Sequence, residues 1–216
     1  SLRESVAETS LSSAQLVLPL FLTEGKDKEE PIASMPGVSR FTLDRSTAVL
    51  REAVALGLGG IAIFPRIADD KKDSSAREAL NPEGLVPSAV RWIKKEFPSL
   101  TIFTDIALDP FSSDGHDGLV RGGEVLNDPT VEVLARMALL HAAAGADFVA
   151  PSDMMDGRIG AIRSALDREG FTGTGILSYC AKYASSFYGP FRDALDSAPR
   201  GGDKKSYQMD PRNSRE

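Results

Sequence analysis

A lysine in an uncharged and mostly apolar stretch is the first candidate for chemistry in this sequence. Lys182 lies between Ser178 and Tyr188, with no other charged residue within five positions on either side. Burial favours the neutral form of a lysine and lowers its pKa, and a neutral amine can attack a carbonyl carbon to form an imine. The stretch therefore indicates imine chemistry. A lysine whose stem lies along apolar surface while its head reaches solvent would show the same pattern.

Polar residues occur where several predicted strands end. In a parallel α/β sheet these ends share one edge, and substrate sites are built there. Side chains from successive strand ends would then lie together, which favours a catalytic role for the lysine. The residues are Asp105 at the end of 101–106, Ser152 and Asp153 after 146–150, Lys182 after 174–179, and Gln208 at the end of 205–209.

The segment 105–117 holds four aspartates and a histidine. Oxygen ligands in such a cluster suit hard cations such as Mg²⁺ or K⁺ better than Zn²⁺. Aspartate, serine and glycine are also common in turns, so spacing alone leaves a metal site and a turn-rich loop as equal alternatives. Arg192, Lys204 and Lys205 could bind a substrate carboxylate, although each by itself is typical of a protein surface.

Strand-like and helix-like segments alternate along the chain, which predicts βα units and a parallel sheet. Most strand-like runs are apolar throughout, as expected for strands buried on both faces. A (β/α)₈ TIM barrel has eight strands, so we expect a single partial α/β barrel over residues 1–216 that is cut short after its sixth strand. The predicted strands are 16–21, 60–64, 101–106, 146–150, 174–179 and 205–209, and the predicted helices run from Asp44 to Leu56, from Pro87 to Phe97, from Asn127 to Gly145, and from Gly157 to Glu169 with Asp156 as N-cap.

Composition narrows the class of protein. The net charge is −6 and no basic stripe occurs, so we expect no nucleic-acid partner. No apolar run approaches the ~20 residues that cross a bilayer. The single cysteine, Cys180, excludes an intrachain disulfide and suits a reducing compartment. We therefore expect a soluble intracellular protein.

Four long motifs occur in order along the chain and are similar to those of the porphobilinogen synthase (5-aminolevulinic acid dehydratase) family. They are SYCAKYASSFYGPFRDA at 178–194, VAPSDMMDGR at 149–158, the aspartate-rich loop at 105–118 and GDKKSYQMDP at 202–211. The resemblance implies a (β/α)₈ barrel that condenses two 5-aminolevulinate molecules to porphobilinogen, without an organic cofactor. It also implies a homo-oligomer, usually an octamer, assembled through an N-terminal arm.

The resemblance also implies roles for individual residues. Lys182 matches the lysine that forms an imine with one substrate. Three residues match positions that hold the carboxylate of this substrate, namely Arg192, Lys204 and Gln208. Three others match polar groups near its amino end, namely Asp105, Ser152 and Asp153.

Two departures from the family pattern affect these expectations. Zinc-dependent members carry three cysteines where this sequence has Ala107, Asp109 and Asp117. The sequence therefore resembles the aspartate-rich type, which implies Mg²⁺ (or K⁺) at Asp109 and Asp117 and disfavours zinc. The second imine-forming lysine of the family, in a Met-Val-Lys-Pro-like motif, does not occur here, and neither does the arginine-rich arm.

Two other classes of function stay open at this point. One is a different imine-forming barrel enzyme of the class I aldolase kind, which needs only one lysine. The other is a noncatalytic partial chain with a role in assembly. A bacterial cytoplasm is the expected location, and a plastid stroma fits equally well with the composition.

Overall fold

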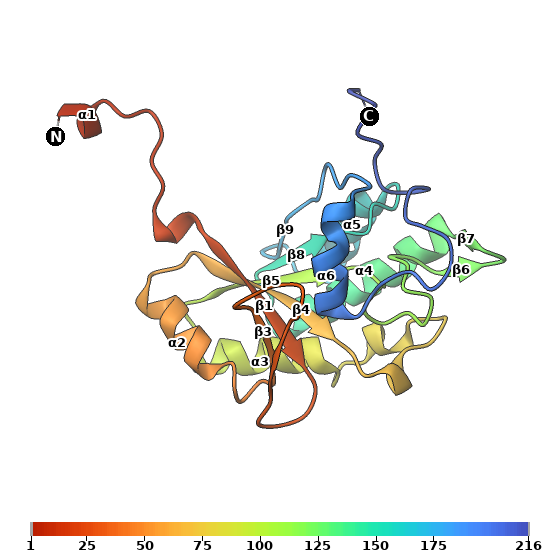
Figure 1. Ribbon diagram of the computed structural model, residues 1–216, viewed down its shortest axis with the longest axis horizontal. Helices are drawn as coiled ribbons and strands as arrows, with labels where there is room; N and C mark the ends of the chain where they lie inside the picture. Colours follow the sequence, from red (N-terminus) through yellow and green to blue (C-terminus); the bar gives the residue numbers. More distant parts are fainter. Residues whose placement is uncertain (1, 216) are drawn as a thin grey trace.

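A twisted and mostly parallel sheet forms the centre of the computed structural model, which describes residues 2–215 (Figure 1). Its strand order is β2-β3-β1-β4-β5-β8-β9, and every neighbouring pair is parallel except β2 and β3. A separate antiparallel hairpin is formed by β6 and β7. The strands are β1 (Val17–Thr23), β2 (Glu29–Pro31), β3 (Ser39–Phe41), β4 (Gly60–Arg66), β5 (Thr101–Ile106), β6 (Val120–Arg121), β7 (Glu124–Val125), β8 (Phe148–Pro151) and β9 (Gly175–Ile176).

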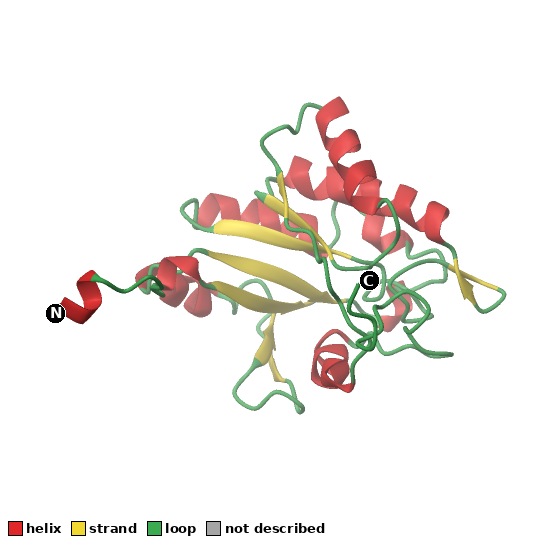
Figure 2. Cartoon of the chain, turned by 90° about the horizontal axis from the view of Figure 1, so that it is seen from above, coloured by secondary structure: helices red, strands yellow, loops and turns green. Residues whose placement is uncertain are grey.

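Several helices lie along one side of this sheet (Figure 2). The segment before β1 extends away from the rest of the chain (Figure 1). The α-helices are α1 (Leu2–Ser5), α2 (Thr47–Ala55), α3 (Leu85–Glu96), α4 (Asn127–Ala144), α5 (Arg158–Arg168) and α6 (Gly189–Leu195), and the 3₁₀ turns are η1 (Ser13–Gln15), η2 (Asp69–Lys71), η3 (Arg77–Leu80) and η4 (Ser186–Tyr188). Among residues 2–215, none of the helices combines the length and the apolar character that crossing a bilayer requires.

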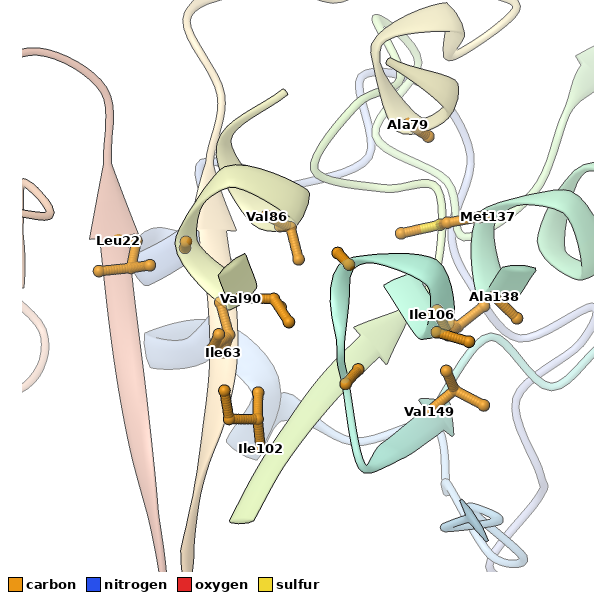
Figure 3. Packing of buried hydrophobic residues seen from close by; sticks show 14 of the residues in the cluster. Leu22, Ile63, Ala79, Val86, Val90, Ile102, Ile106, Met137, Ala138 and Val149 are labelled. Carbon is orange, nitrogen blue, oxygen red and sulfur yellow. The ribbon is translucent and has the colours of Figure 1, made fainter. Parts of the chain in front are cut away.

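The central strands are apolar on both faces because both faces are covered. Side chains alternate between the faces of a strand, so Ile63 of β4 joins the large core against α3 and α4, while Phe64 joins a second cluster against α6. Figure 3 shows the large core, in which Ile63, Val90 and Ile102 pack together. The continuous apolar runs in the sequence thus reflect strands that are buried between two layers of side chains.

The parallel α/β sheet is confirmed, and four predicted strands lie where expected. The fifth is reduced to Gly175–Ile176, which forms an edge of the sheet. The sixth, predicted at 205–209, is wrong. Residues 204–208 form a turn, and Met209 makes only an isolated bridge to Tyr183. A strand needs a neighbour along its length, whereas this segment pairs with residues 182–184 only at Met209 and joins no sheet within residues 2–215, where the barrel is not closed.

The predicted helices are confirmed, but two predicted caps are wrong. The helix predicted from Asp44 begins at Thr47, and the Asp44 carboxylate instead accepts from the backbone N–H of Asp27 at 3.0 Å. The helix predicted to be capped by Asp156 begins after Gly157, a residue in the left-handed region with φ of 77°. Several elements were not predicted, namely α1, α6, the 3₁₀ turns and the antiparallel pairs β2/β3 and β6/β7.

Candidate active site

The Lys182 side chain lies at the carboxyl ends of the parallel strands. Its Nζ donates to the backbone oxygen of Ser152, just after β8, at 2.7 Å. It also lies 3.0 Å from Oδ2 of Asp117, and its side chain is only 11% exposed. The expected position beside the strand ends is therefore confirmed, and the alternative of a head group in solvent is excluded by the burial.

The charge of Lys182 differs from the expectation. Burial lowers the pKa of this amine, but the negative charges of Asp117, Asp109 and Asp105 outweigh that effect and raise the pKa. The expected neutral amine is therefore wrong for this arrangement, because the carboxylates that surround Lys182 come from a distant part of the chain. Lys182 must give up a proton before it can act as a nucleophile.

Asp117 holds two lysines at once. Its carboxylate is fully buried, with Oδ1 2.6 Å from Nζ of Lys204 and Oδ2 facing Lys182. Burial opposes ionisation of Asp117, but the two ammonium groups outweigh it and lower the pKa. Lys204 also lies 3.3 Å from Oδ2 of Asp109. Burial raises the pKa of Asp109, so of these two carboxyl groups Asp117 is the one that ionises more readily.

Asp105 and Ser152 form a hydrogen-bonded pair within the cluster. The Ser152 hydroxyl donates to Oδ1 of Asp105 at 2.6 Å. Burial, followed by the charge of Asp109, raises the pKa of Asp105 to about 7. A carboxyl group with such a pKa can both donate and accept a proton near neutral pH, which is the requirement for general acid–base catalysis.

The three expected carboxylate-binding residues lie around one cavity. Arg192, Lys204 and Gln208 line a cavity of about 460 Å³, together with Ser185 and Ser186. The side-chain oxygen of Gln208 is buried and has no hydrogen-bond partner within the described residues. Cationic and amide donors on one cavity can bind a carboxylate, and the structure brings the three residues of this predicted set together.

The helix α6 carries Arg192 to this cavity. Its Phe191 packs on Phe64 of β4, with ring centroids 4.9 Å apart. Its carboxyl-terminal end is held by the amine of Lys72, which donates to the backbone oxygen of Asp196 at 2.8 Å. A cation at a helix carboxyl terminus stabilises it electrostatically. These contacts explain why α6 forms, although no sequence periodicity predicted it.

Asp153 does not join the lysine cluster. Its Oδ1 accepts from the backbone N–H of Met155 at 2.7 Å, and its Oδ2 lies 3.2 Å from Nε of Arg158. Burial raises the pKa of Asp153 to about 7. The guanidinium of Arg158 reaches on to the backbone oxygen of Tyr179 at 2.9 Å. This buried pair therefore connects the ends of β8 and β9 beside the site. Arg158 was not predicted, because its role depends on contacts that spacing does not reveal.

His141 of α4 is buried, and burial lowers its pKa to about 3. It is therefore a neutral core residue.

The donors at Asp109 and Asp117 do not fit a divalent cation in this arrangement. Both carboxylates face Lys204, and Asp117 also faces Lys182. Within residues 2–215, no three His, Cys, Asp or Glu side chains are grouped so that they could hold a metal ion. A cation here would have to displace an ammonium group, so no catalytic step is assigned to a metal.

Comparisons with known proteins give a consistent result. The family model described as "Delta-aminolevulinic acid dehydratase" matches residues 1–216. The chloroplastic delta-aminolevulinic acid dehydratase of Hordeum vulgare is 54% identical over 218 residues, which cover all of this chain and 51% of that protein. The chloroplastic delta-aminolevulinic acid dehydratase 1 of Arabidopsis thaliana is 54% identical over 216 residues, which cover 99% of this chain and 50% of that protein. The chain thus spans about half the length of these relatives.

A solved structure from Toxoplasma gondii, delta-aminolevulinic acid dehydratase in complex with the reaction product porphobilinogen, superimposes with a TM-score of 0.93. It is 49% identical, and the match covers 99% of this chain and 61% of that chain. The chain therefore belongs to the delta-aminolevulinic acid dehydratase (porphobilinogen synthase) family.

Proposed function

We propose that this protein condenses two molecules of 5-aminolevulinate to porphobilinogen, a dehydrating step of tetrapyrrole biosynthesis. The observation that carries the proposal is the buried amine of Lys182 beside Asp105 and Asp117 at the strand ends. Family membership supports the same reaction, and so does the Toxoplasma gondii relative with its bound product.

The proposed first step is an imine between Lys182 and one substrate. Arg192 and Gln208 hold the substrate carboxylate in the cavity beside Lys204. After Lys182 passes a proton to a neighbouring carboxylate, its nitrogen attacks the ketone carbon. The ketone oxygen then takes up protons and leaves as water, for which the Asp105 carboxyl with a pKa of about 7 is a suitable donor.

The imine acidifies the adjacent C–H bond, so that this carbon can bond to the second substrate. Formation of one C–C bond and one C–N bond, with release of two water molecules overall, gives the pyrrole. Holding the substrates covalently supplies the positional advantage of an intramolecular reaction. The second lysine that the family resemblance implies is not among residues 1–216, so the complete reaction is proposed for the full-length protein.

Borohydride reduction in the presence of 5-aminolevulinate tests the imine. The reductant should fix substrate mass to the peptide that contains Lys182, as read by mass spectrometry. Lys182→Arg keeps the positive charge next to Asp117 and should give no adduct at this position. Wild-type protein without an adduct on Lys182 would contradict the proposal, and so would an adduct on Lys204 in its place.

We also propose an assembly and a location for the full-length protein. A homo-octamer is supported by family resemblance and by the N-terminal segment, whose Leu2, Val6 and Leu11 are 70–82% exposed on the described chain. Light scattering of the full-length protein would measure the number of subunits.

A plastid stroma is favoured over a bacterial cytoplasm because the relatives above are chloroplastic. Magnesium stays a prediction from the sequence, without support from the donor geometry.

A further inference from the structure

A second set of contacts involves the backbone of Asp117. The backbone N–H of Asp117 donates to the hydroxyl oxygen of Tyr207 at 3.3 Å. The same hydroxyl lies 3.1 Å from Nδ1 of His116, and Nε2 of His116 lies 2.9 Å from the backbone oxygen of Gly201. His116 is 7% exposed, so this set of contacts is shielded from water.

The partners of these groups determine where the hydrogens lie. A carbonyl oxygen can only accept, so Nε2 of His116 carries a hydrogen and donates to Gly201. Nδ1 is then the acceptor for the hydroxyl hydrogen of Tyr207, whose oxygen accepts from Asp117. Burial and the nearby charge of Asp117 raise the pKa of Tyr207, which keeps this hydroxyl protonated. Each donor in the series therefore has one acceptor.

Tyr207 also belongs to the turn that carries two substrate-binding candidates. The backbone N–H of Gln208 donates to the backbone oxygen of Lys204 at 2.9 Å, which closes this turn. Directly after it, the N–H of Met209 donates to the backbone oxygen of Lys182 at 3.0 Å. A single hydroxyl group therefore connects the loop of Asp117 to the turn that holds Lys204 and lies against the backbone of Lys182.

Close packing of the loop leaves little room for an alternative position. At Gly115, with φ of +69°, an added Cβ would lie 2.2 Å from the backbone oxygen of Ala198. The N–H of Arg200 donates to the backbone oxygen of Asp114 at 3.0 Å. The loop that precedes Asp117 is thus pressed against the segment that leads to Lys204.

We propose that His116 and Tyr207 are positioning residues, which hold the Asp117 carboxylate between the amines of Lys182 and Lys204. They act through Asp117 and do not touch the reacting atoms. For catalysis this inference rests on the proposed function, but the effect on the two amines is independent of any reaction. Without the Tyr207 hydroxyl, Asp117 should hold both lysines less firmly.

Competitive labelling of lysines with acetic anhydride at one fixed pH tests the inference without substrate. In Tyr207→Phe, labelling of Lys182 and Lys204 should rise several-fold relative to Lys72, a buried lysine held by Asp69 and Asp196 elsewhere in the fold. The matched control is Tyr183→Phe, because Tyr183 is 40% exposed and its hydroxyl has no hydrogen-bond partner within residues 2–215. This control should label like wild type.

Steady-state kinetics of the full-length protein give the second readout. Loss of one buried hydrogen bond corresponds to about a fivefold effect, so Tyr207→Phe should lower kcat about fivefold with KM within about twofold of wild type. His116→Asn keeps an acceptor near the position of Nδ1 and should retain more activity than His116→Ala.

Unchanged labelling of Lys182 in Tyr207→Phe would overturn the inference. A parallel rise at Lys72 would also overturn it, because that result means general loosening of the fold. A wild-type protein that forms no porphobilinogen would refute the proposed function instead. The labelling pattern would still show whether His116 and Tyr207 position Asp117.

Discussion

Replacing Asp117 with asparagine should destabilise the protein, because two buried ammonium groups then lose the carboxylate that lies between them. Asp117 is fully buried, and its carboxylate lies 3.0 Å from the amine of Lys182 and 2.6 Å from that of Lys204. Asparagine has nearly the same shape, so the substitution removes charge without opening a cavity. The change in the free energy of unfolding therefore reports the electrostatic role of this carboxylate.

The expected magnitude follows from these distances. Two unit charges about 3 Å apart interact by ~5 kcal/mol at an effective dielectric constant of about 20. Measured losses after removal of one partner of a buried ion pair are about 3–5 kcal/mol. Lys204 keeps Asp109, and Lys182 keeps the backbone oxygen of Ser152. We therefore expect a loss near the lower end, about 3 kcal/mol.

Urea unfolding at pH 7 would measure this loss, with fluorescence of the single tryptophan, Trp92 in α3, as the signal. Glu83→Gln is the matched control, because it breaks an ion pair to Arg91 at 3.0 Å on the protein surface. Surface pairs contribute little, so this control should unfold like wild type. A loss below about 1 kcal/mol in Asp117→Asn would refute the reasoning.

The pH dependence gives a second check on Asp117. The two lysines lower its folded-state pKa, so its contribution is present above the unfolded pKa of about 4 and disappears as the pH falls through the folded value. The stability difference between Asp117→Asn and wild type should therefore vanish in strong acid. A difference that persists there would have a cause other than the ion pairs.

Three further predictions concern the surroundings of the site. Burial raises the pKa of Asp153 to about 7, so its contribution to the free energy of unfolding is fully present below about pH 4 and is lost as the pH rises to about 7. In urea titrations, Asp153→Asn should reduce this loss of stability by roughly 2–4 kcal/mol. A pH profile of stability that runs parallel to that of wild type would contradict this prediction. Gly115→Ala should lower Tm by several degrees, because its Cβ would meet a backbone oxygen at 2.2 Å, whereas Gly123→Ala, which has open space, should lower it less. Magnesium should bind more tightly to Lys204→Met than to wild type, because Asp117 then loses a competing ammonium group; equal affinity by calorimetry would place any magnesium site elsewhere.

Much of the sheet was predictable because burial on both faces leaves a local mark. The apolar runs of β1, β4, β5 and β8 lie within a few residues of their predicted limits. The helix α4 ends at Gly145, whose φ of 106° suits glycine, as predicted. The prediction of a strand at 205–209 fails because Tyr207 and Met209 alternate with polar residues, a pattern that also suits a turn packed beside another segment.

The residue types of the site were also available from the sequence. Polar residues after successive strands identified Lys182, Asp105 and Ser152, and parallel strands do bring them together. The four motifs identified the family, and the comparisons confirm it. The role of Asp117 as the partner of two lysines had no sequence signal, since aspartate in a glycine-rich loop is also a common turn residue.

The sequence by itself thus determined the parallel α/β class, the family, and the position of a candidate lysine beside the strand ends. Only the tertiary structure decided the charge of that lysine. Asp117 lies 65 positions from Lys182 and 87 from Lys204 along the chain, yet within 3.0 Å of both amines in space. A local apolar stretch indicates desolvation, which lowers the pKa of a lysine. Coulomb attraction depends on spatial distance, and here the attraction to nearby carboxylates turns the pKa shift of Lys182 from a decrease into an increase.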